Sequence, residues 1–282
     1  MAIRIITDSA SDILPKEAEK LNIKVLPLKT YFGEEEYLDG VTITNAEFFQ
    51  KLVESDVMPT TSQLAPYEYE DAFREAIEAG DEVISISLSS KLSGSYQSAS
   101  IAAEEFGDAI ALVDSENVSL GEWTLVQLAV RLRDEGKSKQ EIVDILEEKK
   151  KKIRVIALLD TLEYLKKGGR ISSAAAFAGT LLSIKPVVTV EDGVVAVLGK
   201  ARGSRNGNNM LMDLVRKSGG INFDMPYCLA YTGLSDALLQ KYIQDSAALY
   251  EGQTDCLPIV SIGSTIGTHV GPGAIGAAFF VK

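Results

Sequence analysis

The stretch LSSKLSGSYQSA, residues 88–99, joins a predicted strand to a predicted helix. The apolar run 82–88 predicts a β-strand, and residues 96–106 predict a helix. Because α/β sheets bind ligands at strand-to-helix turns, the hydroxyl groups of this stretch are well placed for a site. The unpaired N–H groups at the start of such a helix attract an anion. Ser93 or Ser95 could present a hydroxyl to a carboxylate or phosphate; the simpler alternative is that Ser93 only caps the helix.

The rest of the chain before residue 153 alternates apolar strands with helices. This alternation is typical of a mostly parallel sheet with helices on both faces. Hydroxyl or carboxylate residues end three strands, at 7–9, 89–90 and 114–115, and a parallel arrangement would bring them to one edge. Strands are predicted at 3–8, 23–28, 82–88 and 109–114, and helices at 15–21, 44–53, 66–79, 96–106, 120–133 and 138–152. The helix at 44–53 is predicted to open with a capping box between Thr44 and Glu47.

The pattern changes after residues 154–160. Apolar segments at 184–190 and 194–198 flank Asp192-Gly193, a pair that predicts a hairpin turn. Further strands are predicted at 227–231, 256–262 and 274–281, and helices at 208–217 and 235–250. We therefore expect an α/β protein of two domains. Residues 1–153 would form a three-layer α/β/α domain with a mostly parallel sheet, and residues 154–282 an α+β domain with a largely antiparallel sheet.

Composition limits the class of partner. The chain of 282 residues is 46% hydrophobic and carries a formal net charge of −12, which argues against broad nucleic-acid surfaces and anionic lipid headgroups. It shows neither a run of about 18 apolar residues nor a signal-peptide pattern. Its two cysteines lack the spacing of a zinc site or a disulfide framework. We expect a cytoplasmic protein without a membrane span, whose partner is small or local.

The single histidine, His269, lies in the glycine-rich stretch GTHVGPGAIG, residues 267–276. Glycines let backbone approach a ligand closely, which favours a functional role over a structural one. One histidine cannot build the usual metal site, and the chain after Gly276 is too short for a dinucleotide fold, so we expect neither metal nor cofactor. A serine acyl hydrolase using Ser93 and His269 remains the alternative function, although no serine has the G-x-S-x-G pattern.

Six motifs follow one another along nearly the whole chain. They are TDSASD at 7–12, PTTSQ at 59–63, SKLSGSYQSA at 90–99, LDTLEYLKKGGRI at 159–171, IKP at 184–186 and THVGPGA at 268–274. Each is weak alone, but together and in this order they are specific. The chain thereby resembles the DegV family, bacterial fatty-acid-binding proteins that act as the binding subunit of a fatty acid kinase.

The resemblance implies a carrier without catalytic residues that buries one long-chain fatty acid between or beneath its two domains. A separate ATP-dependent kinase would then phosphorylate the carboxylate to an acyl phosphate. The family's carboxylate-binding residues correspond to Thr61, Ser93 and His269. Secondary candidates are Ser62, Ser95 and the backbone amides of Gly94 and Ser95. The family's arginines correspond to Arg170 and Arg202, which would serve the kinase partner and the acyl phosphate without contributing to fatty acid binding.

A long acyl chain also requires an apolar tunnel. Residues expected to line it are Ala174, Phe177, Ala178 and Leu181. Two stretches depart from the family pattern: Glu122-Trp123 replaces small residues and glycine, and residues 204–209 carry less lysine than usual. Docking of a kinase there is therefore less strongly indicated than binding of the acid.

Overall fold

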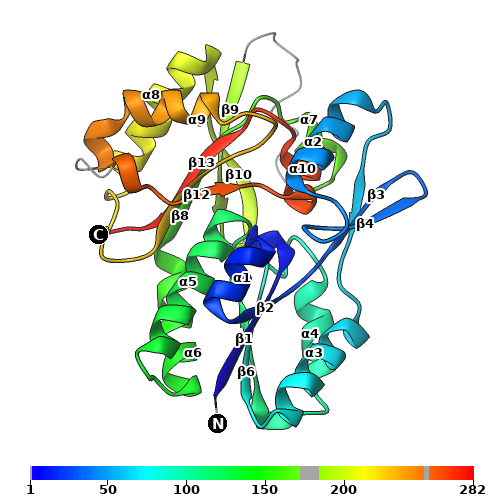
Figure 1. The fold of residues 1–282 in the computed structure, drawn as a ribbon. Helices are drawn as coiled ribbons and strands as arrows, with labels where there is room; N and C mark the ends of the chain where they lie inside the picture. Colours follow the sequence, from blue (N-terminus) through cyan, green and yellow to red (C-terminus); the bar gives the residue numbers. More distant parts are fainter. Residues whose placement is uncertain (1, 172–183, 251–253) are drawn as a thin grey trace.

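The computed structural model describes residues 2–171, 184–250 and 254–282. Its first sheet is parallel throughout, in line with the predicted, mostly parallel sheet. The strand order is β2-β1-β6-β7, with β1 at Ile3–Asp8, β2 at Ile23–Leu26, β6 at Glu82–Ser87 and β7 at Ile110–Asp114. Helices α3 (Pro66–Glu78) and α4 (Ser95–Ala103) cover one face; α5 (Leu120–Asp134) and α6 (Lys139–Lys149) cover the other (Figure 1). The short helix α1 (Pro15–Leu21) packs beside β2.

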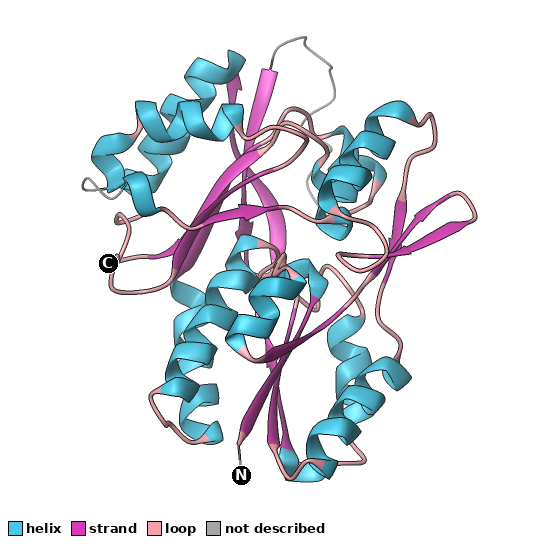
Figure 2. Cartoon of the chain, viewed as in Figure 1, coloured by secondary structure: helices cyan, strands magenta, loops and turns pink. Residues whose placement is uncertain are grey.

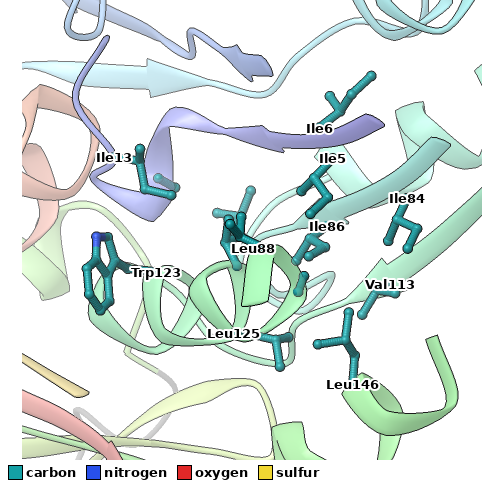
Figure 3. Close-up of a cluster of buried hydrophobic side chains, with 14 of the residues drawn as sticks. Ile5, Ile6, Ile13, Ile84, Ile86, Leu88, Val113, Trp123, Leu125 and Leu146 are labelled. Atoms are coloured by element: carbon teal, nitrogen blue, oxygen red, sulfur yellow. The ribbon is translucent and has the colours of Figure 1, made fainter. Parts of the chain in front are cut away.

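Burial of β-branched side chains holds these layers together. Ile5, Ile86 and Val113 stand on one face of the sheet and meet Leu125 of α5 and Leu146 of α6 (Figure 3). All five side chains are fully buried. Removing such aliphatic surface from water is the main force that joins helix to sheet.

The second sheet is mostly antiparallel, which confirms the predicted fold class. Its order is β10-β9-β8-β13-β11-β12, and only β11 and β12 are parallel (Figure 2). The predicted hairpin joins β9 to β10, where Asp192 and Gly193 have φ values of 48° and 76°, as a two-residue turn with positive φ requires. The strands are β8 (Ile153–Leu158), β9 (Ile184–Glu191), β10 (Val194–Arg202), β11 (Tyr227–Tyr231), β12 (Ile259–Ser261) and β13 (Ile275–Phe280).

Helix α5 lies between the two sheets. It contacts β1 and β6 of the first sheet and β8, β11 and β13 of the second. A helix packed on both sides must be apolar around most of its circumference, and α5 buries residues from Leu120 to Leu132 on every face. The other face of the second sheet is covered by α8 (Gly203–Lys217) and α9 (Ala237–Asp245).

A third, small sheet was not predicted. It consists of β3 (Lys29–Phe32), β4 (Glu35–Leu38) and β5 (Thr60–Ser62) in the order β4-β3-β5. These short strands lack long apolar alternation, so their pairing depends on neighbours distant in sequence. Beside the sheet lies α2 (Asn45–Glu54), whose predicted capping box between Thr44 and Glu47 is formed.

The helix that carries His269 is α10 (Ser264–Val270), which packs against α2, β3 and β5. Phe48 and Phe49 of α2 press so closely on Gly267 that a side chain there would collide with both rings. Small residues in this stretch therefore allow a helix to approach its neighbours. The domain boundary at residue 153 stays a prediction, and the contacts between α10 and residues 29–62 cross it.

Candidate functional site

A cavity lies where β5, the loop before α4 and α10 meet. Three backbone segments from distant parts of the chain form it, because β5 pairs with β3 and α10 packs against both strands. We call it the head cavity. Its lining includes Thr61, Ser62, Gln63, Leu92, Ser93, Arg170, Thr265 and His269.

His269 is bonded to Thr61 inside this cavity, with 2.9 Å between Nε2 and the threonine Oγ1. Burial lowers the pKa of the imidazole to about 4, and the positive charge of Arg170 acts in the same direction. His269 is therefore neutral at physiological pH. The other ring nitrogen, Nδ1, is buried without a hydrogen-bond partner and faces Gly168, where a Cβ would collide with it.

The neutral ring carries a single proton, and its position is assigned from these partners. A buried N–H without an acceptor is costlier than a bare lone pair, so the proton belongs on Nε2. Nε2–H then donates to Thr61 Oγ1, which leaves the hydroxyl hydrogen of Thr61 free to donate to a ligand. His269 thus orients Thr61 as a donor.

Ser93 lines the cavity, whereas Ser95 lies behind it. The two hydroxyl oxygens are 3.0 Å apart, and the Ser95 amide donates to Ser93 Oγ at 3.3 Å. Ser95 is fully buried, and its Oγ accepts from the Leu64 amide at 3.4 Å. The N-cap of α4 is Gly94 and no side chain caps the helix, so the capping interpretation of Ser93 is wrong; Ser93 precedes the cap, accepts from the Ser95 amide and lines the cavity.

Gly94 lies outside the cavity lining. Its Cα is packed against the Gln63 side chain, which leaves no room for a Cβ. Of the secondary candidates, only Ser62 contributes to the cavity wall. Gly94 and Ser95 instead shape the loop that presents Ser93.

The two arginines occupy different places. Arg170 lines the head cavity, where Nη1 donates to Gly168 O at 2.6 Å and Nε donates to Leu92 O at 3.3 Å. Arg202 is exposed at the end of β10 and, in the described part of the chain, belongs to the lining of neither cavity discussed here. Only Arg170 can place its charge beside a ligand in the head cavity.

A second cavity adjoins the first, and the two share the wall residues Val118, Leu165, Val195, Ile266 and Val270. We call it the tail cavity. Its floor is the second sheet, where one cross-strand row places Val188, Ala157, Gly276 and Ala230 side by side. Most of the remaining lining residues are aliphatic, and the others are Ser119, Thr189, Tyr231 and Thr232. Ala174, Phe177, Ala178 and Leu181, expected to line a tunnel, fall outside the described residues.

The structure does not form a hydrolytic triad. Ser93 Oγ is bonded to Ser95 and His269 Nε2 to Thr61, so no Ser93–His269 hydrogen bond exists. Asp8, one possible third member, instead accepts from the amides of Ala10 and Leu88. Within residues 2–171, 184–250 and 254–282, no group of three His, Cys, Asp or Glu side chains is arranged to hold a metal ion.

Thr265 is among the lining residues that the sequence analysis missed. Thr265 lies four residues before His269 on α10, so both side chains fall on one face of the helix. The spacing was visible in the sequence. It carried no information until residues 264–270 were known to be helical.

The site combines hydroxyl groups and a neutral imidazole in one cavity with a mostly aliphatic cavity beside it, an arrangement that suits an amphiphile with a single acidic end. The DegV family model, described as an uncharacterised protein of the DegV family, matches residues 2–282. The chain belongs to the DegV family. A DegV domain-containing protein of Caldanaerobacter subterraneus is 35% identical over 283 residues, covering 99% of both chains.

Solved structures of relatives share the whole fold. A fatty-acid-binding DegV family protein from Thermus thermophilus has a TM-score of 0.88 at 35% identity, covering 100% of both chains. DegV of Bacillus subtilis, described as a fatty acid binding protein, has a TM-score of 0.84 at 31% identity, also covering 100% of both. A stearic-acid-binding protein from Eubacterium ventriosum has a TM-score of 0.86 at 28% identity, covering 99% of this chain and 97% of the other.

Proposed function

We propose that this chain binds one long-chain fatty acid, with the carboxylate in the head cavity and the acyl chain in the tail cavity. The observation that carries the proposal is that two cavities adjoin and share wall residues, one with polar groups at Thr61, Ser93 and His269 and the other with a mostly aliphatic lining. Fatty acid binding by the relatives from Thermus thermophilus and Bacillus subtilis supports it.

The donors suit an ionised carboxylate. A buried carboxylate without partners is very costly, and charge-assisted hydrogen bonds from hydroxyls offset that cost. Thr61 donates outward because His269 occupies its acceptor side, and Ser93 faces the same cavity. Arg170 adds a positive charge at the cavity wall. In the part of the chain that the structure describes, this charge forms no ion pair with an Asp or Glu side chain.

We also propose that the chain is a cytoplasmic carrier and that a separate ATP-dependent kinase phosphorylates the bound acid to an acyl phosphate. The missing contact between Ser93 and His269 supports a carrier over a hydrolase, because a serine nucleophile needs a bonded base. No helix in the described ranges is long and apolar enough to cross a membrane.

The first test is mass spectrometry of protein purified without detergent, intact under native conditions and then after organic extraction. We expect one fatty acid per chain, and the extract identifies its length and saturation. Protein that is empty and also fails to bind added oleate would refute the proposal.

Substitutions then locate the carboxylate. Thr61→Ala and Ser93→Ala should each weaken oleate binding by roughly tenfold or more, because each removes a hydrogen bond to a charged group. Ser100→Ala is the matched control, since its Oγ donates to Tyr96 O within α4 and lies outside the head cavity. Unchanged affinity in both test variants, with normal folding, would place the carboxylate elsewhere. A chromogenic ester should show no turnover by the unsubstituted protein.

A further inference from the structure

Thr265 has a buried hydroxyl that nothing in the structure satisfies. The residue is only 5% exposed, and its Oγ1 has no hydrogen-bond partner. Thr268, also buried on α10, has a partner, because its Oγ1 donates to Ser264 O, four residues earlier in the helix, at 2.8 Å. Thr265 is the second residue of α10, so no helical carbonyl lies four residues before it, and its hydroxyl needs a partner from elsewhere.

The position of Thr265 is fixed by its backbone. Asp39 accepts from the Thr265 amide at 3.2 Å and from the Ser264 amide at 2.8 Å. These bonds hold the first turn of α10, and one helical turn later His269 projects from the same face. Thr265 and His269 both contribute to the wall of the head cavity. Thr265, with its unpaired hydroxyl, is therefore one of the residues that line the cavity to which we assign the carboxylate.

We propose that Thr265 is a further ligand-binding residue, whose hydroxyl donates a hydrogen bond to the carboxylate of the bound fatty acid. The inference rests on the proposed function and adds a donor to it. A carboxylate has two oxygens with about four acceptor positions, enough for the hydroxyls of Thr61, Ser93 and Thr265 together.

This assignment gives the unpaired hydroxyl a physical reason. A buried donor without a partner destabilises the free protein, and native proteins keep such groups chiefly where they serve a function. Binding would supply the missing acceptor, so the site is built for its ligand at the expense of the empty protein's stability. If the hydroxyl were purely structural, removing it would instead lower the stability of the free protein, because the hydroxyl would already stabilise that state.

The test compares Thr265→Val with Thr268→Val in delipidated protein. Valine keeps the β-branched shape of threonine and replaces its hydroxyl with a methyl group. We expect Thr265→Val to weaken oleate binding by roughly ten- to a hundredfold while the melting temperature of the free protein stays the same or rises. Thr268→Val should leave oleate affinity unchanged, and Thr265→Ser, which retains a hydroxyl, should restore most of the binding. Oleyl alcohol, which lacks the carboxylate, should bind Thr265→Val about as well as it binds the unsubstituted protein.

The outcomes separate the two proposals. If the unsubstituted protein binds oleate and Thr265→Val binds equally well, the role of Thr265 is refuted and the fatty acid site stands. The role of Thr265 is likewise refuted if Thr265→Val lowers the melting temperature and weakens oleate and oleyl alcohol alike, because the hydroxyl would then be structural. If the unsubstituted protein binds no oleate, the proposed function fails and the inference fails with it.

Discussion

His269 shows how one residue's surroundings determine its chemistry. An exposed imidazole titrates near neutral pH, but burial lowers the pKa of His269 to about 4. The neutral ring can then donate one hydrogen bond to Thr61, which leaves the hydroxyl hydrogen of Thr61 free to donate to a ligand. A charged imidazole would have to donate from both nitrogens, and Nδ1 has no acceptor in the described structure.

Because the chain has one histidine, NMR of protein without a histidine tag reads this titration directly. We expect the ring of the free protein to stay neutral down to about pH 5, and bound oleate to raise its pKa because an anion favours the charged form. Between about pH 6.5 and 4 the unfolded chain binds a proton that the folded chain does not, so stability should fall as the pH drops through this window. A free-protein pKa near 6.5 would contradict the buried, neutral ring.

Helix α10 is held by carboxylates from two loops of the N-terminal part. Asp12 accepts from the Gly263 amide at 2.8 Å and from Ser119 Oγ at 2.6 Å, and Asp39 holds the next two amides. Burial, with a smaller contribution from the nearby carboxylates of Asp39 and Asp8, raises the pKa of Asp12 to about 8. The helix that carries the site is therefore anchored partly by a group that ionises near physiological pH.

We expect Asp12→Asn to reduce the loss of stability at alkaline pH. The folded pKa of Asp12 exceeds the unfolded value, so the folded state binds more protons between pH 3.8 and about 8, and stability falls as pH rises through that range. Asparagine can accept from Gly263 and donate to Ser119 without titrating. From pH 6 to 9 the unsubstituted protein should lose on the order of 2 kcal/mol more than the variant does.

Denaturant unfolding at both pH values measures this difference. Asp56→Asn, an exposed position just after α2, is the control and should leave the pH dependence unchanged. Equal pH dependence in Asp12→Asn and the unsubstituted protein would mean that Asp12 is ionised throughout.

For the whole molecule, the cavities lie where the layers meet. Helix α5 supports both sheets, and the start of α5, the second sheet and α10 all contribute to the tail cavity. The head cavity lies at its end, where β5 and the loop before α4 contribute the hydroxyls. A ligand there contacts segments from both halves of the chain, so its binding should stabilise the whole fold.

Substitutions of the two arginines test which of them serves the proposed kinase partner. We expect Arg202→Ala to leave oleate affinity unchanged and to slow phosphorylation of bound oleate by the kinase, because Arg202 is exposed and outside the cavities. Arg170→Ala should weaken oleate binding severalfold, since Arg170 lines the head cavity. This differs from the expectation based on family resemblance, which gave both arginines to the partner. Loss of oleate binding in Arg202→Ala would assign it to the pocket.

The sequence by itself determined the elements whose signals are local. Alternating β-branched residues indicated β1 and β6, the Thr44–Glu47 capping box indicated the start of α2, and Asp192-Gly193 indicated the hairpin. These succeed because a few neighbouring residues decide the backbone conformation. Motif resemblance also identified Thr61, Ser93 and His269, all of which line one cavity.

Only the tertiary structure decided how those residues act. The bond between Thr61 and His269 joins positions 208 residues apart, and the separation of Arg170 from Arg202 depends on packing that no local pattern encodes. Helix α10 and the small sheet gain their stability from each other, so neither has a strong signal alone. The unpaired hydroxyl of Thr265 and the raised pKa of Asp12 exist only because folding removes water from both groups.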